Sequence, residues 1–319
     1  MKEIVFVVLI FLAISKKYFA QACCTAGTPI LSSLEMSTTD YKSWKFGLTY
    51  QYNSLKSVYD GTDKLDEFSR ERITQSALFE ISYGIFPRFT LTALFSYMNQ
   101  KRLVDPVTGS NNRLNSSGLG DFLVLAKYKL INLNFIDQRE FAIGGGVKAP
   151  LGKADVKSDG ILLPADIQPG TGSWDGIFWT YFSQGFSPFL PLTFSINLTY
   201  RANGTFDRFG SNFGGYKFGN EFAVQAGFGY RTDFFFDLTM FVRYRYQGAD
   251  NFNGSEIENT GGNWVSVVPG INLKLTDGFT ARISGKIPFY RSLKGTQLTT
   301  TFTTSIAFYY TIKPSLLDF

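Results

Sequence analysis

The chain lacks the side chain on which much enzyme chemistry depends, because none of its 319 residues is a histidine. This excludes Ser-His and Cys-His nucleophile pairs and removes the commonest general base. No pair of carboxylates stands in a context that would raise a pKa. The glycines at 144–146 lie inside an apolar run rather than at a strand-to-helix turn, so they make no phosphate loop. We therefore predict no catalytic residue, no cofactor and no enzymatic activity.

The two cysteines are adjacent, at Cys23 and Cys24, and cannot close an ordinary long-loop disulfide. They form either a vicinal pair in an N-terminal tail or a site at which Cys23 carries a lipid. The preceding Ala20-Gln21-Ala22 matches a lipoprotein cleavage site poorly. Without histidine to complete a metal site, metal binding is the least favoured use of this pair.

Charged side chains recur instead at alternate positions within apolar runs. Between residues 236 and 247, every second residue is apolar, while Asp237, Arg243 and Arg245 lie on the opposite register, which only Phe241 interrupts. The same alternation places ten basic and four acidic residues on polar faces: Arg72, Glu80, Asp121, Lys127, Lys129, Lys148, Arg201, Lys217, Glu221, Asp237, Arg243, Arg245, Arg282 and Lys286. In a sheet closed around a lumen, this set would either fill the lumen with salt bridges or form a cationic lining that favours anionic or polar solutes.

A period of two residues indicates β-strands, and no helical period of 3.6 competes with it. Many of the runs exceed the five or six residues usual in soluble sheets, and tilted transmembrane strands need about 9–11. On this register Leu198 and Val242 lie on the apolar face and would contact lipid. The predicted strands are 44–54, 71–83, 89–100, 119–130, 140–149, 174–183, 192–203, 217–231, 236–248, 263–275, 279–288 and 297–312.

The links between these strands alternate strictly in length. Outer-membrane barrels combine short periplasmic turns with longer extracellular loops, whereas a soluble sandwich has no reason to alternate in this way. An even number of strands then puts both termini in the periplasm. The short links are 84–88, 131–139, 184–191, 232–235 and 276–278, and the long ones are 54–70, 101–118, 150–173, 203–216, 249–262 and 289–296.

Composition supports the same fold. Aromatic residues make up 17% of the chain and charged residues only 18%, while the mean hydropathy of −0.02 is that of alternating strands rather than of membrane helices. Inside lipid, an unpaired strand edge would cost several kcal/mol for each backbone group, so the sheet must close. We predict an all-β fold, a transmembrane antiparallel β-barrel of about twelve strands in an up-and-down meander. Aromatic girdles are expected at Trp44, Tyr83, Phe89, Tyr128, Trp174, Tyr200, Tyr230, Tyr246 and Tyr310.

The N-terminus has the features of a secretory signal: Lys2, an apolar run over 4–14 and small residues at Ala20 and Ala22. We predict a cleaved signal peptide over 1–20, a periplasmic segment over 21–43 that could enter the lumen as a plug, and the barrel over 44–319. No later apolar stretch is long enough for a helical span. Without the signal's charges, the formal net charge falls from +5 to +3, which gives little support to a nucleic-acid partner.

Four short motifs resemble one family. They are Gly118-Leu119-Gly120-Asp121 with Leu125–Leu130, Gly146–Gly152, Pro169–Asp175, and Pro288-Phe289-Tyr290 with Gly295–Leu298. In order and spacing they resemble the outer-membrane transporter-like barrels grouped with the meta-pathway phenol-degradation proteins. The resemblance implies passage of small, often aromatic or hydrophobic compounds, and it carries over no binding residue. The terminal Phe319 also resembles the aromatic that the barrel-assembly machinery reads, although Phe308 and Tyr310 could serve instead.

These observations predict a bacterial outer-membrane channel or transporter for uptake or diffusion of small solutes. The alternative is a non-conducting structural or adhesive barrel that acts through its extracellular loops. The expected partners are outer-membrane lipid, the barrel-assembly machinery and a small-molecule solute.

Overall fold

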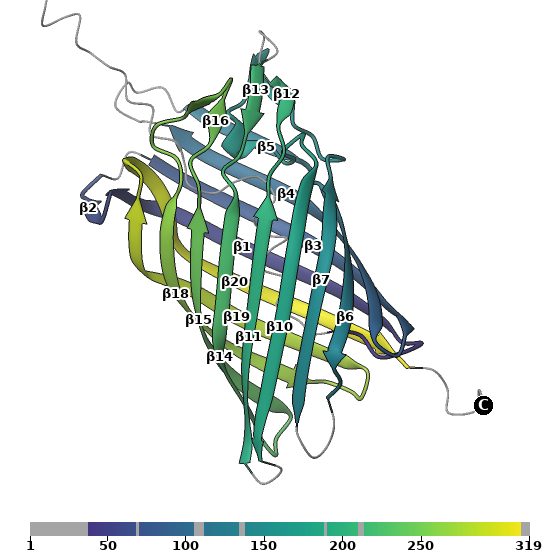
Figure 1. Ribbon diagram of the computed structural model, residues 1–319. Coiled ribbons are helices and arrows are strands. Elements are labelled where there is room, and N and C mark those ends of the chain that lie inside the picture. Colours follow the sequence, from purple (N-terminus) through teal and green to yellow (C-terminus); the bar gives the residue numbers. More distant parts are fainter. Residues whose placement is uncertain are drawn as a thin grey trace, which may run out of the picture.

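The computed structural model describes residues 38–67, 70–104, 112–133, 138–187, 190–209 and 214–313. Its main feature is one antiparallel sheet of fourteen strands, curved into a barrel (Figure 1). Two of the fourteen, β2 (Asp63–Leu65) and β5 (Asn112–Leu119), extend hairpins beyond the wall, which leaves twelve wall strands. These are β1 (Trp44–Asp60), β3 (Arg70–Phe86), β4 (Phe89–Val104), β6 (Phe122–Ile131), β7 (Arg139–Ala149), β10 (Asp175–Ser187), β11 (Leu190–Ala202), β14 (Glu221–Arg231), β15 (Phe236–Gln247), β18 (Gly262–Lys274), β19 (Phe279–Leu293) and β20 (Thr296–Ile312).

Each wall strand pairs with its neighbours in chain order, and β1 also pairs with β20, which closes the barrel. Trp44 lies opposite both Ile312 and Tyr83, so β1 begins and β20 ends at the same end of the barrel. We call this the terminal end and the other the loop end. The closed twelve-stranded meander confirms the predicted fold class. In the part of the chain that the structure describes, no helix is long and apolar enough to cross a membrane.

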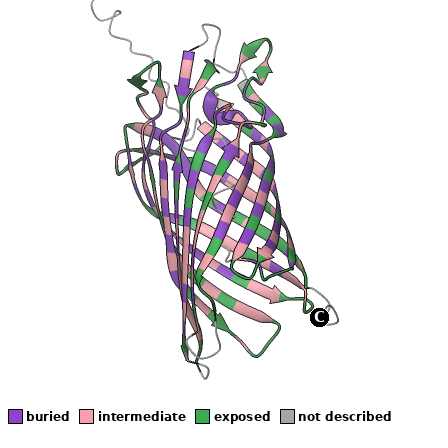
Figure 2. Ribbon diagram, turned by 45° about the vertical axis from the view of Figure 1, so that its right-hand side comes forward, coloured by how far each residue is buried: buried purple, intermediate pink, exposed green. Residues whose placement is uncertain are grey.

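The two faces of the wall differ as the alternation requires. In β15, Val242 exposes 47% of its surface on the outside, whereas Arg243 exposes 7% and points inward. Leu198 likewise alternates with the buried Asn197 and Thr199. Figure 2 shows buried and exposed positions succeeding one another along the same strands. Apolar side chains thus cover the outside, where lipid would solvate them, and the polar set is enclosed.

Several predicted boundaries are wrong. The long link expected at 289–296 is a tight turn at Lys294-Gly295. The ladder between β19 and β20 ends at Lys286 and Thr303, but β19 continues in pairing with β18 and β20 in pairing with β1. Polar residues can extend paired strands where water replaces lipid, so apolar alternation does not mark the end of pairing. The strand expected at 217–231 begins only at Glu221. The strand expected at 119–130 is broken between β5 and β6, where Gly120 approaches Ser96 so closely that an added Cβ would lie 2.3 Å from its hydroxyl oxygen.

The long links build a second layer over the loop end. Strands β12 (Phe206–Phe209), β13 (Gly214–Lys217), β16 (Asn251–Phe252) and β17 (Ser255–Glu256) form a separate four-stranded sheet. The link after β7 carries the hairpin β8 (Lys157–Ser158) and β9 (Ile161–Leu162), then the 3-10 turn η1 (Ala165–Ile167). Ala165 packs with Tyr216 and Phe218 in a small apolar core, which joins this link to the four-stranded sheet.

Candidate functional site: the barrel lumen

An ion cluster fixes the link between β7 and β10 at the loop end of the lumen. Lys148 Nζ donates to Asp121 Oδ2 at 2.6 Å and lies 2.9 Å from Asp175 Oδ2, its cross-strand neighbour. Lys148 also donates to the Thr171 hydroxyl and to the Ser173 carbonyl. All three charged side chains are almost fully buried, so each depends on the others for its partners.

Asp121 also holds the backbone of the link. Its Oδ1 accepts the Gly152 N–H at 3.1 Å, and its Oδ2 accepts the Thr171 N–H at 2.9 Å. A Cβ atom added to Gly152 would lie 2.7 Å from the carbonyl carbon of Gly120, and a Cβ atom added to Gly170 would lie 2.6 Å from the carbonyl carbon of Gly152. The backbones therefore approach so closely that only glycine fits at these positions. Three of the family-like motifs, at 118–121, 146–152 and 169–175, therefore meet here, and the last two are the two ends of the link between β7 and β10. We call this arrangement the loop clamp (Asp121, Lys148, Thr171, Ser173 and Asp175).

A second ionic contact draws the middle of the same link inward. Asp166, in η1, lies 3.2 Å from Arg72 Nη1 and 3.3 Å from Arg102 Nη1. Residues 165–171 are all buried, and Gln168 accepts the Val156 N–H. The link thus folds inward over the loop end of the lumen instead of extending away from it, and we infer that in this conformation it closes that end.

Further along the wall, Glu221 joins two arginines. Its carboxylate oxygens lie 2.9 Å from Arg201 Nη2 and 2.7 Å from Arg245 Nε, and Arg201 is its direct cross-strand neighbour. The Arg245 guanidinium also stacks 4.9 Å above the Trp264 ring. Buried carboxylate oxygens shared between two guanidinium groups are fully satisfied, so this part of the lumen fits the salt-bridge interpretation.

Another group lies toward the terminal end. Lys45 pairs with Glu80 at 3.3 Å, and Lys127 Nζ lies 4.6 Å above the Trp179 ring. Lys127 and Trp179 both stand opposite Gly144, on the two strands that flank it, and an added Cβ there would lie 3.1 Å from the indole. The missing side chain at Gly144 therefore leaves the room in which the ammonium and the indole meet.

Residues 38–43 contact inward-facing side chains at this same end. Thr39 exchanges two hydrogen bonds with Thr90, and Thr38 donates to Glu140 at 3.0 Å. Lys129 lies 3.6 Å from Asp40. The rest of the segment predicted to enter the lumen, together with the predicted signal peptide, Cys23, Cys24 and Phe319, lies outside the described residues.

A cavity lies in the lumen between these groups. Three of its lining residues are cationic, and the described lining contains no carboxylate. Gly285 and Lys286 of β19 lie where the ladder between β18 and β19 is interrupted, beside Val268 and Pro269 of β18. The lining consists of Thr49, Gln51, Leu78, Arg243, Val268, Arg282, Ser284, Gly285, Lys286, Thr303, Ser305, Ala307 and Tyr309.

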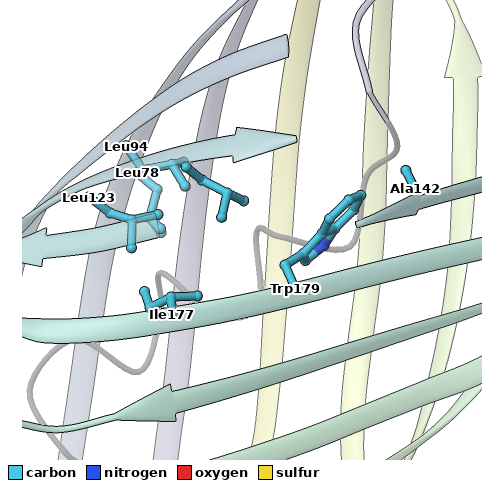
Figure 3. Close-up of a cluster of buried hydrophobic side chains, with 7 residues drawn as sticks. Leu78, Leu94, Leu123, Ala142, Ile177 and Trp179 are labelled. Atoms are coloured by element: carbon cyan, nitrogen blue, oxygen red, sulfur yellow. The ribbon is translucent and has the colours of Figure 1, made fainter. Parts of the chain in front are cut away.

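On the opposite side of the lumen, an apolar cluster lies between the loop clamp at one end and Glu80 and Lys127 at the other. Inward side chains of β3, β4, β6, β7 and β10 form one buried cluster, against which Tyr181 packs. Figure 3 shows these side chains projecting from several strands toward the interior. The cluster consists of Leu78, Leu94, Leu123, Leu125, Ala142, Ile177 and Trp179, and we call it the apolar sector.

Two of the predicted lumen residues lie elsewhere. Asp237 is at the terminal-end turn, where it pairs with the half-exposed Lys274 at 2.8 Å. Lys217 is exposed in β13 of the loop sheet. Conversely, Lys45 and Glu140 are absent from the predicted set of inward charged residues, although both lie on the polar register of predicted strands. Arg102, Asp166 and Asp175 are absent as well, because strand alternation gave no usable signal for them.

Comparison with known proteins agrees with this architecture. Residues 68–312 match the sequence profile of a family described as "Putative MetA-pathway of phenol degradation". A solved COG4313 outer membrane channel from Pseudomonas putida F1 is similar with a TM-score of 0.70 and 14% identity, over 86% of this chain and 97% of that one. The transport unit of the autotransporter AIDA-I from Escherichia coli aligns with a TM-score of 0.48 and 12% identity, over 91% and 99%. No curated protein sequence matches the chain.

Proposed function

Because the chain belongs to the putative MetA-pathway phenol-degradation family and folds as an outer-membrane-type barrel, we propose that it is an outer-membrane channel for small solutes. The observation that carries this proposal is the lumen cavity with Arg243, Arg282 and Lys286 in its lining. Cations that line an internal space, with no carboxylate in its described lining, support a path for polar solutes. Lipid and the assembly machinery are the partners this location requires, and both termini would be periplasmic.

The proposed channel prefers anions weakly. Arg201 and Arg245 share Glu221, and Lys148 lies between two aspartates, so these charges contribute little net field. Arg243, Arg282 and Lys286 stand around the cavity instead, although each also interacts within the protein. In a narrow passage of low dielectric, an excess of positive charge raises the local concentration of anions.

The test is the reversal potential of purified full-length protein in planar bilayers under a KCl gradient. We expect discrete current steps with weak anion selectivity, and we expect Arg282→Gln with Lys286→Gln to lower that selectivity. Lys274→Gln, at the terminal-end turn, is the matched control and should leave it unchanged. Cation selectivity in the wild type, or no effect of the double substitution, would refute the cationic-lining idea.

A non-conducting barrel that acts through its loops is the second candidate. The observation that favours it is the four-stranded loop sheet over a closed loop end. The absence of current steps both in the wild type and in a variant with a released loop clamp would support this candidate against the channel.

A further inference from the structure

The lumen carries an apolar cluster and a cationic cavity lining on different strands. The apolar sector is supplied by β3, β4, β6, β7 and β10. The three cations of the cavity come from β15 and β19, on the other side of the strand order. A path for inorganic ions would need only the second of these surfaces, and a path for neutral hydrocarbons only the first.

The cavity joins the two sides. Leu78 belongs to the apolar sector and also lines the cavity, together with Val268 and Tyr309. Arg282 and Lys286 are four residues apart on β19, so both side chains point to the same face of the strand. Arg243 belongs to β15, which is separated from β19 by β18. One small molecule in this cavity would therefore meet apolar carbon and cationic nitrogen at the same time.

We infer that the cavity binds small amphipathic organic anions, of which an aromatic carboxylate is the simplest. Its ring would lie against Leu78, Val268 and Tyr309, and its carboxylate would accept charge-assisted hydrogen bonds from the cavity's cations. Because those cations already interact within the protein, the carboxylate binds by exchange with these contacts. The inference takes the cavity as the solute site and in that respect rests on the proposed function.

Equilibrium binding to full-length protein in detergent, measured by calorimetry, tests the inference without requiring conduction. Benzoate is the probe, and three molecules each remove one feature: acetate has no ring, benzyl alcohol has no charge, and benzylamine has the opposite charge. We expect benzoate to bind at least about tenfold more tightly than each of the three, because it alone uses both surfaces. Equal affinities for benzoate and acetate, or for benzoate and benzyl alcohol, would overturn the inference.

Two variants separate the contribution of the cations to benzoate affinity from that of the apolar lining. Arg282→Gln with Lys286→Gln should weaken benzoate by about tenfold or more and leave benzyl alcohol unchanged. Val268→Thr keeps the volume, adds a hydroxyl and should weaken benzoate but not acetate, so it tests the apolar side if the charge variant fails to fold. Lys274→Gln is again the control. Benzoate binding unaffected by both variants would place it outside this cavity and refute the assignment.

The outcomes also distinguish this inference from the proposed function. Current steps without selective benzoate binding would leave the channel standing and overturn the ligand class. Selective benzoate binding without any current would do the reverse: the cavity would be an organic-anion site in a barrel that does not conduct.

Discussion

Removing the positive charge of the loop clamp should open the loop end of the lumen. Lys148 is nearly fully buried and is the cation between Asp121 and Asp175. Lys148→Met keeps the length and apolar stem of the side chain but leaves two buried carboxylates beside each other. Breaking a buried ion pair by removing one partner costs about 3–5 kcal/mol. At about 1.4 kcal/mol per factor of ten, the local opening equilibrium would shift by roughly two to three and a half orders of magnitude.

This cost should appear as local opening rather than as unfolding of the wall. Asp121 holds Gly152 and Thr171, which lie in the link, while the ladders of β6, β7 and β10 do not depend on it. Once the link detaches, water can solvate both carboxylates. We therefore expect faster tryptic cleavage after the exposed Lys153 and Lys157, larger single-channel conductance, and unchanged heat-dependent gel migration of the folded barrel.

Two variants make the result interpretable. Asp175→Asn leaves one aspartate for one lysine and should open the link far less than Lys148→Met. Lys274→Met breaks the partly exposed pair with Asp237, which is worth at most about 1 kcal/mol, and should leave cleavage and conductance unchanged. If Lys148→Met matched the wild type in both assays, the clamp would not be what closes the loop end.

Two further predictions concern the wall and the loop sheet. Arginine at Leu198 or Val242, on the outward register, should destabilise the barrel by about 2–4 kcal/mol near the bilayer midplane, and unchanged urea unfolding in lipid for both would contradict the register. Burial, reinforced by Asp166, raises the pKa of Asp250, so its proton is held more tightly in the folded loop sheet than in the unfolded chain. The contribution of Asp250 to the stability of the loop sheet should then be complete below the unfolded carboxyl pKa of about 3.9, and it should be lost as pH rises through the folded pKa. The variant Asp250→Asn should not show this pH dependence. Hydrogen exchange of the loop sheet, corrected for the intrinsic exchange rate, measures both.

The wall could be predicted from the sequence because one physical rule acts on every wall residue. A strand between lipid and lumen must alternate, so the inward position of Arg243 and the outward position of Val242 follow from periodicity alone. The same rule would have found Lys45 and Glu140. It fails in β10, where Ile177 and Trp179 are apolar and point inward while Phe178 is apolar and points outward, so no contrast marks the two faces.

The closure of the lumen could not be predicted in this way. Asp166 meets Arg72 across 94 positions of sequence, and nothing in the local pattern of either residue indicates the other. The net positive charge predicted for the lumen lacked two carboxylates. Asp166 belongs to a loop, and Asp175 belongs to a strand whose register was ambiguous. The motifs around Asp121 and Gly170 carried the missing information, but only the fold shows that they meet.

The chemistry of the loop clamp bears on whether the closed lumen can open. A buried ion pair is a weak source of stability, since well-packed apolar residues of similar volume often do as well or better. An apolar plug that left the lumen would expose its surface to water at about 25 cal/mol per Å². A clamp of one lysine and two aspartates regains hydration on release, which offsets much of the lost attraction. A link held by charge can therefore close the loop end and still detach, which a channel requires and a purely structural barrel does not. The comparison of Lys148→Met with Asp175→Asn measures this balance directly.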